Sequence, residues 1–200
     1  MSDIVMENIS KSYSDKCVLD NINVTFESGR INCLMGESGI GKTTLLRIVM
    51  GLEKYEGCIS GVGRVSAVFQ ENRLIEDISA IENIKLVLNG VPEKDIAKEL
   101  AMLLPEESLY QKVSELSGGM QRRVAIVRAM MSDCDTICMD EPFTGLDDDN
   151  KENVCRYIKK NLKGRTAIVV THDKSEAKAL DAKIYLLTSG SAIATIIGNC

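Results

Sequence analysis

The stretch from Gly36 to Thr43, which reads GESGIGKT, limits the possible folds of this chain more than any other part of it. It fits the pattern G-x-x-x-x-G-K-[S/T]. A short apolar run at 31–35 precedes it, and a helical pattern at 45–50 follows it. The sequence therefore predicts a strand, a phosphate-binding loop and a helix in that order.

The glycines of this loop let the backbone bend tightly, so that successive amide groups point at a phosphate near the positive end of the helix dipole. Lys42 is expected to reach the β- and γ-phosphates of a nucleoside triphosphate and to act in catalysis, and Thr43 is expected to bind magnesium. The predicted nucleotide-binding residues of this segment are Gly36, Glu37, Ser38, Gly39, Gly41, Lys42, Thr43 and Thr44. Kinases, GTPases and transport ATPases share the motif, so it leaves the reaction open.

Four short apolar runs predict the strands of a parallel sheet. They lie at 31–35, 65–69, 136–139 and 167–170. Runs of this length, rich in branched residues, are typical of strands buried on both faces. Amphipathic helical stretches lie between the runs, as crossovers between parallel strands require. The clearest of these stretches extends from Asp147 to Lys163, and Gly164 ends it.

Four chemically useful residues each follow one of these apolar runs: Gly36, Gln70, Asp140 and His172. The carboxyl ends of parallel strands share one edge of a sheet, and ligands bind there. Asp140 is expected to hold the magnesium ion, and the adjacent Glu141 to orient or deprotonate an attacking water molecule. His172, the one histidine of the chain, is expected beside the γ-phosphate.

The rest of the chain predicts two additions to this core within one domain, residues 1–200. Alternating segments predict an antiparallel β arm, mainly residues 1–30 and 55–69. Residues 71–131 predict an α-helical lobe. In this lobe Ser79 caps a helix that extends to Leu88, and Pro92 opens another. The 200 residues, of which 44% are hydrophobic, suffice for one sizeable core.

Composition argues against several classes of partner and location. The 29 acidic and 24 basic residues give a net charge of −5, and aromatic residues make up 4% of the chain, so nucleic acid is not an expected partner. The seven cysteines include no CxxC pair, which argues against a disulfide framework or a zinc site, and Cys200 is expected to be an exposed thiol. The first residues do not resemble a secretion signal, and polar residues interrupt the apolar stretch 184–197. We therefore expect a cytoplasmic protein that meets a membrane only through a partner.

The segment from Leu116 to Gln121 reads LSGGMQ, and here the chain resembles the ABC ATPase family, whose signature is LSGGQ or a close variant. The resemblance extends across essentially the whole chain. In order, it includes Tyr13, the phosphate loop, Gln70, the signature, Asp140-Glu141-Pro142, Gly145-Leu146-Asp147 and Thr171-His172-Asp173. One departure is the run Gln121-Arg122-Arg123, where the family usually has a Gln-Arg pair. The segment between Gly51 and Val65 and the helical lobe are also shorter than in many relatives.

The resemblance implies that two ATP molecules with Mg²⁺ are enclosed between two ATPase subunits. Ser117, Gly118 and Gly119 of one subunit would face the γ-phosphate held by the other. Asp147 would cross between the subunits, and Tyr13 would stack on adenine. Gln70 would sense the magnesium ion and the membrane partner, as both a metal-binding and a catalytic residue, and His172 would hold the γ-phosphate.

The function implied is that of the ATP-binding subunit of an ABC membrane transporter, an ATPase peripheral to the inner face of the membrane. Its expected partners are an integral membrane permease, a second ATPase subunit that is the same or a different chain, and a substrate-binding protein. The segments 68–74 and 171–177 loosely resemble those of bacterial importers of nitrate, sulfonates or taurine. An ABC-type ATPase of a non-transport complex, serving cofactor assembly or envelope signalling, and a P-loop kinase remain alternatives. The sequence does not specify the cargo or the direction of transport.

Overall fold

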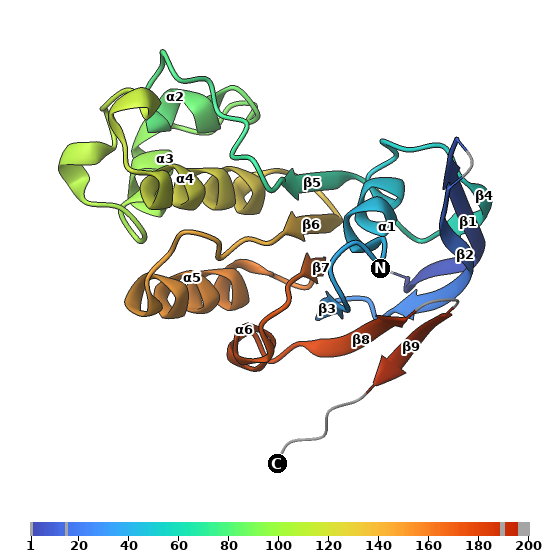
Figure 1. The fold of residues 1–200 in the computed structure, drawn as a ribbon. Coiled ribbons are helices and arrows are strands. Elements are labelled where there is room, and N and C mark those ends of the chain that lie inside the picture. The colour runs from blue at the N-terminus through green and yellow to red at the C-terminus, as the bar shows by residue number, and fades with distance from the viewer. Residues whose placement is uncertain (1, 15, 189–190, 196–200) are drawn as a thin grey trace.

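The computed structural model describes residues 2–14, 16–188 and 191–195, and Figure 1 shows their arrangement. Cys200 and the end of the apolar stretch 184–197 lie outside the described residues, so the expectations about them remain predictions. Within the part of the chain that is described, no helix has both the length and the apolar character needed to cross a membrane.

A six-stranded sheet forms the centre of the described structure, and its strand order is β5-β6-β7-β3-β8-β9. The first five strands are parallel and β9 is antiparallel to β8. The strands are β3 (Ile31–Met35), β5 (Val65–Val68), β6 (Thr136–Asp140), β7 (Thr166–Val170), β8 (Lys183–Thr188) and β9 (Ser191–Thr195). Every residue of β3, β6 and β7 is buried, which explains why the sequences of these strands are largely apolar.

Successive residues of these strands contribute to two different hydrophobic cores, because side chains alternate between the two faces of a sheet. Cys33 and Met35 of β3 pack into the core beside the long helices, whereas Leu34 between them packs into the core beside the arm. The helices of the central part are α1 (Lys42–Val49), α4 (Gly118–Met131), α5 (Asp148–Asn161) and α6 (Lys174–Ala179). The sheet is therefore covered on both faces, as the sequence predicts.

Three strands form the antiparallel arm, in the order β2-β1-β4. They are β1 (Ile4–Tyr13), β2 (Lys16–Phe26) and β4 (Glu56–Ser60). The assignment of residues 55–69 to the arm is wrong in its second half. Val65–Val68 pairs with β6 in parallel and belongs to the central sheet. An edge strand of the central sheet need not be fully apolar, and three of the four β5 residues are only half-buried.

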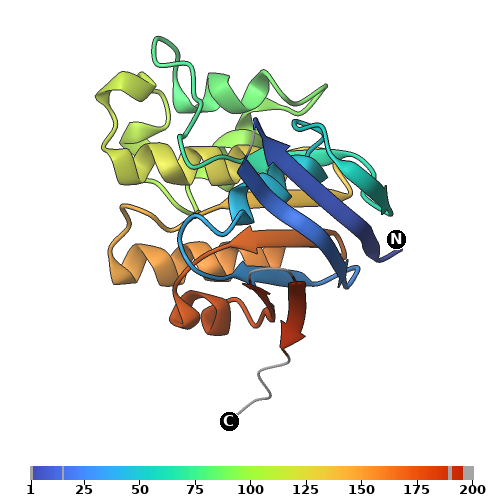
Figure 2. The same cartoon turned by 45° about the vertical axis from the view of Figure 1, so that its right-hand side comes forward.

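The helical lobe contains α2 (Ala80–Lys85) and α3 (Glu93–Leu100), with 3₁₀ turns at Glu106–Ser108 and Val113–Glu115. Ser79 caps α2 as expected. It accepts a hydrogen bond from the Glu82 amide (3.2 Å), and its own amide donates to the Glu82 carboxylate (2.8 Å). The helix ends at Lys85, before the predicted Leu88. In both views the lobe lies to the upper left of the sheet; the arm lies to the right of the sheet in Figure 1 and in front of it in Figure 2.

Candidate functional site

Two glycines of the phosphate loop are required by the backbone between β3 and α1. Gly36 has φ 152°, and a Cβ there would lie 2.5 Å from the Leu187 carbonyl oxygen. Gly41 precedes α1 with φ 108°, and its Cβ would lie 2.7 Å from a methyl group of Leu19. Any larger residue at either position would clash and would need a strained backbone.

The start of α1 offers backbone donors to an anion. The first amides of a helix have no partner within it. In the described structure no side chain caps this end, and the helix begins with the bond from the Leu45 amide to the Gly41 carbonyl (2.8 Å). Lys42 is buried, and its ammonium group donates to the carbonyls of Gly36 (2.9 Å) and Glu37 (2.8 Å). The loop therefore presents free amides and a cation, the chemistry that binds phosphate.

A cavity of about 270 Å³ opens beside this loop. It is lined by Val18, Ser38, Gly39, Gly41, Lys42, Thr43, Thr44, Gln70, Asp140, Glu141 and Val170. Of the predicted site residues, nine thus lie around one space: three come from the ends of β5 and β6, and six from the loop and the start of α1. The carboxyl ends of the parallel strands meet at this edge of the sheet, as expected.

Asp140 supplies the donor chemistry for a magnesium ion. Its side chain is buried, and its Oδ1 has no hydrogen-bond partner among the described residues. Burial raises the pKa of this carboxyl, whereas the Thr43 hydroxyl, Arg122 and Lys42 act in the opposite direction. A buried carboxylate oxygen next to a hydroxyl matches the oxygen ligands that Mg²⁺ prefers. Gln70 lines the same cavity, and its side-chain amide oxygen is of the same ligand type.

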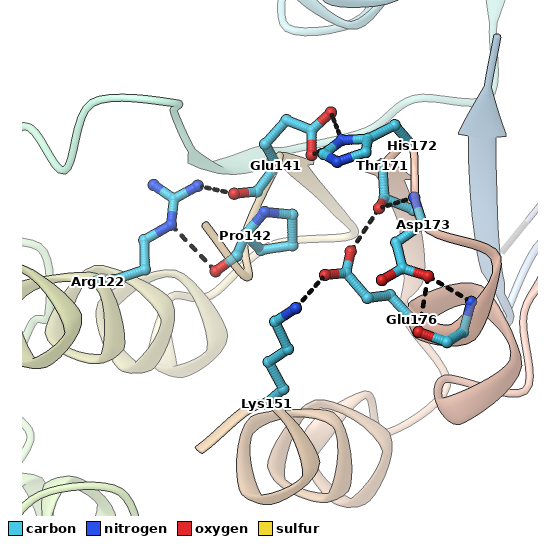
Figure 3. A network of polar contacts seen from close by, with 9 residues as sticks. Arg122, Glu141, Pro142, Lys151, Thr171, His172, Asp173 and Glu176 are labelled. Carbon is cyan, nitrogen blue, oxygen red and sulfur yellow. Dashed lines mark hydrogen bonds and ion pairs between the residues drawn. The ribbon is translucent and has the colours of Figure 1, made fainter. Parts of the chain in front are cut away.

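Glu141 turns the chain directly after β6. It has φ 47°, an unusual conformation for a residue with a side chain, and such conformations cluster at functional sites. Its amide donates to the Val170 carbonyl (2.9 Å), and both carboxylate oxygens lie 3.1 Å from Nδ1 of His172 (Figure 3). The side chain of His172 is 77% exposed, so its other ring nitrogen is accessible. The structure thus brings the predicted water-activating carboxylate into contact with the predicted γ-phosphate ligand.

A buried polar network, which the sequence motifs did not predict, fixes the turn that carries His172 (Figure 3). The Thr171 hydroxyl donates to the Glu176 carboxylate (2.5 Å) and accepts from the Asp173 amide (3.1 Å). Lys151 of α5 forms an ion pair with Glu176 (3.3 Å). The sequence contained one signal for this network. An acidic residue and a lysine lie on two helices that flank the same strand end, and their side chains can meet there. The network connects the helix that begins after Asp147 with the turn that holds His172.

The remaining predicted residues do not line this cavity. Ser117 caps α4 and accepts from the Met120 amide (3.2 Å), and it is exposed together with Gly118. A Cβ on Gly119 would lie 3.2 Å from the Gly145 carbonyl, so the signature turn packs against the loop before Asp147.

Asp147 and Tyr13 are exposed as well. Asp147 caps α5 through the Asn150 amide (2.8 Å). Tyr13 ends β1 with its side chain 43% exposed and the Lys11 ammonium 4.6 Å from its ring centre. Gly36 and Glu37 shape the loop from outside the cavity lining.

The contact between Glu141 and His172 leads to a first testable expectation. Glu141 raises the pKa of His172 above its ordinary value of 6.5, because the carboxylate favours the charged imidazolium. The charge-assisted contact is therefore complete below that ordinary value and is lost as the pH rises through the raised pKa. Replacing Glu141 with glutamine should return the pKa toward 6.5.

NMR titration of the imidazole measures this pKa directly, because the chain has one histidine. Asp173→Asn is a suitable control, since it also removes a carboxylate next to His172 but one that raises the pKa of His172 less than Glu141 does. An unchanged pKa in Glu141→Gln would show that the two side chains are apart in solution.

Comparison with known proteins places this geometry in a family. The family described as ABC transporter matches residues 19–144. The chain is 34% identical to the spermidine/putrescine import ATP-binding protein PotA of Pasteurella multocida (strain Pm70), with 94% of this chain and 56% of the relative aligned. It is also 34% identical to the ergothioneine transport ATP-binding protein EgtV of Helicobacter pylori (strain G27), with 90% and 94% aligned. The chain thus spans about half the length of some curated relatives that it matches and nearly all of another.

A solved structure agrees with these relatives. The chain superposes on a dimeric ATP-binding cassette in a post-hydrolysis state bound to ADP and Pi, with a TM-score of 0.86 and 28% identity. The match covers 98% of this chain and 100% of the other. The predicted P-loop core with a parallel sheet, an antiparallel arm and helices is therefore confirmed. The fold, the phosphate-loop cavity and these relatives together show that the chain belongs to the ABC transporter family, as an ATP-binding domain.

Proposed function

We propose that this chain is an ATP-hydrolysing subunit that works in a pair and drives a separate membrane permease. One observation supports the hydrolytic part most strongly: Asp140 and Glu141 line the same cavity as Lys42 and Thr43 of the phosphate loop. Transfer of a phosphoryl group to water requires a carboxylate that binds the metal and a second carboxylate that acts on the water molecule, both beside the bound phosphates.

The chain's own residues divide the chemistry between them. Lys42 and the loop amides hold the β- and γ-phosphates, and Asp140, Thr43 and Gln70 would hold Mg²⁺. Mg²⁺ held by these residues would supply positive charge to neutralise the negative charge that develops on the phosphates. Glu141 accepts the proton of the attacking water molecule. His172 donates a hydrogen bond to the γ-phosphate through the ring nitrogen that does not face Glu141.

Exposure of the signature supports the pairing of two subunits. Ser117 and Gly118 are at the start of a 14-residue helix, a good position for binding an anion, but they do not line the chain's own cavity. A second subunit, identical or related, would place its signature over this cavity and complete the site. The solved relative that superposes on this chain is likewise a dimer.

The permease, the peripheral position on the inner face of a membrane and a separate substrate-binding protein are the remaining parts of the proposal. They are supported by relatives that are named import or transport ATP-binding proteins. Two relatives with equal identity are named for different cargoes, polyamines and ergothioneine. The proposal therefore assigns the choice of cargo to other subunits.

The proposed pairing predicts how the rate depends on protein concentration. With ATP and Mg²⁺, the hydrolysis rate per molecule should rise with concentration and level off once pairs dominate, because a single chain provides only half of each site. Steady-state release of phosphate over a wide dilution series measures this dependence. Lys42→Ala, which loses the phosphate ligand, controls for contaminating ATPases. A constant rate per molecule down to dilute monomer would contradict the composite site.

A further inference from the structure

Arg122 is a buried cation in the second turn of α4, the helix that begins with the signature. Its side chain is 2% exposed, and no carboxylate accepts a hydrogen bond from it among the described residues. A buried charge is costly unless it is well hydrogen-bonded. Its partners therefore indicate what this arginine does.

All five backbone acceptors of the Arg122 guanidinium belong to the two loops that carry the catalytic groups. From the end of β6 it binds the carbonyls of Asp140 (2.7 Å), Glu141 (2.5 Å) and Pro142 (3.1 Å). From the end of β5 it binds the carbonyls of Phe69 and Gln70, the latter at 3.2 Å. Figure 3 shows the side chain reaching from α4 to Glu141 and Pro142. The planar fork of arginine provides enough donors, in fixed directions, to bind both loops at once.

Some of these bonds hold a part of the backbone that has an unusual conformation. Glu141 has φ 47°, and its carbonyl accepts from Arg122 while its amide donates to Val170 of β7. The peptide groups on both sides of Glu141 are thus fixed, one by the sheet and one by α4. Burial lowers the pKa of Arg122, whereas the Asp140 and Glu141 carboxylates oppose that shift and stabilise its charge. Gln70, held by the same guanidinium, lines the cavity that Glu141 also lines.

We propose that Arg122 is a positioning residue: it fixes the Gln70 loop and the Glu141 turn relative to each other and to the signature helix. Its effect on hydrolysis rests on the proposed function, whereas its effect on the Glu141 turn does not. Arg122 itself lies outside the cavity lining, so it acts through the two loops. If α4 rotates when the signature contacts nucleotide held by the other subunit, this guanidinium would transmit the rotation to both loops.

Arg122→Lys tests the proposal, because it keeps the positive charge and removes the fork. Misplacing a catalytic group by about 1 Å costs about 10²-fold in rate. We expect the kcat for ATP hydrolysis to fall about that much, while the KM for ATP and the binding of ATP to the monomer change less than about threefold, since Lys42 and the loop amides remain. A parallel loss of ATP affinity would indicate a general disturbance of the site and overturn the proposal.

The chain offers a matched control at Arg165. Its guanidinium also binds backbone carbonyls: those of Met130 (2.9 Å), Ser132 (3.2 Å), Asn161 (2.5 Å) and Leu162 (3.0 Å). None of these residues lines the phosphate-loop cavity. Arg165→Lys should also lower the melting temperature, since it loses bonds to backbone carbonyls, and should leave kcat within about threefold. Equal loss of kcat in both variants would show that Arg122 contributes stability only.

A second readout separates failure of this inference from failure of the proposed function. In Arg122→Lys the looser Glu141 turn should bring the NMR-determined pKa of His172 closer to 6.5, and in Arg165→Lys that pKa should not move. This measurement needs no ATPase activity. Arg122→Gln, which can still donate to a carbonyl, replaces Arg122→Lys if the latter does not fold. A wild-type His172 pKa in the folded variant, or failure of both Arg122 variants to fold, would overturn the positioning role.

Discussion

Replacing Glu141 with glutamine should lower the rate of ATP hydrolysis by about 10²–10⁴, the usual loss when a positioned general base is removed. Glutamine has the same size and can still form hydrogen bonds, but it has no charge and no basicity. Asp140 is buried at the very end of β6, whereas Glu141 lies beyond it in the turn, against His172. In the proposed mechanism, Asp140 therefore binds the metal and Glu141 acts on the water molecule. Steady-state phosphate release measures the loss.

Binding of ATP should survive this change, because Lys42, Thr43, Asp140 and the loop amides remain. The consequence is a long-lived closed pair, which size-exclusion chromatography should detect as a shift from monomer to dimer with ATP and no shift with ADP. If the natural partner is a different chain, the same experiment is done with that chain. Glu152→Gln is the control, since Glu152 is 74% exposed and pairs only with Arg156 among the described residues. Near-normal hydrolysis by Glu141→Gln would remove Glu141 from the role of base.

The sequence predicted the core strands because their burial determines their composition. Every residue of the runs at 31–35, 136–139 and 167–170 is buried, and most residues of each run are apolar. The strand order was not predictable in the same way, since parallel pairing joins residues far apart in the chain. β4 has mostly exposed residues, and its pattern therefore did not show where the arm ends.

The loop and strand-end residues of the site were predictable for a related reason. Gly36 and Gly41 adopt backbone angles that other residues avoid, and Asp140 is the last residue of β6, directly after its apolar part, so local sequence marks all three. Arg122 and Glu176 were missed because charged residues in helices normally face solvent. Only the packing of α4 and α6 against the strand ends turns these two side chains inward, and a single sequence does not contain that information.

Replacing Ser117 with arginine should abolish hydrolysis and leave ATP binding by the monomer nearly intact. Ser117 is exposed at the start of α4 and does not line the chain's own cavity, so in the proposed pair it contacts nucleotide held by the other subunit. A long cationic side chain there would block closure. Ser117→Ala separates this effect from loss of the helix cap, which alone costs about 1 kcal/mol of stability. Titration with a fluorescent ATP analogue, alongside phosphate release, measures the two properties.

Mixing Ser117→Arg with Lys42→Ala provides the decisive form of this experiment, given that the chain forms a homodimer. Each variant alone should be inactive, since every site lacks either the signature serine or the phosphate ligand. In a mixed pair, Lys42 of the first variant and Ser117 of the second meet in one intact site. Random pairing in a symmetric dimer makes half the pairs mixed, with one intact site in two, so activity should recover to at most about a quarter of the wild-type rate. Differential tagging can demonstrate that mixed pairs form. If such a mixture is inactive, one intact site is not enough for hydrolysis. Loss of ATP binding by monomeric Ser117→Arg would instead place Ser117 in its own chain's site.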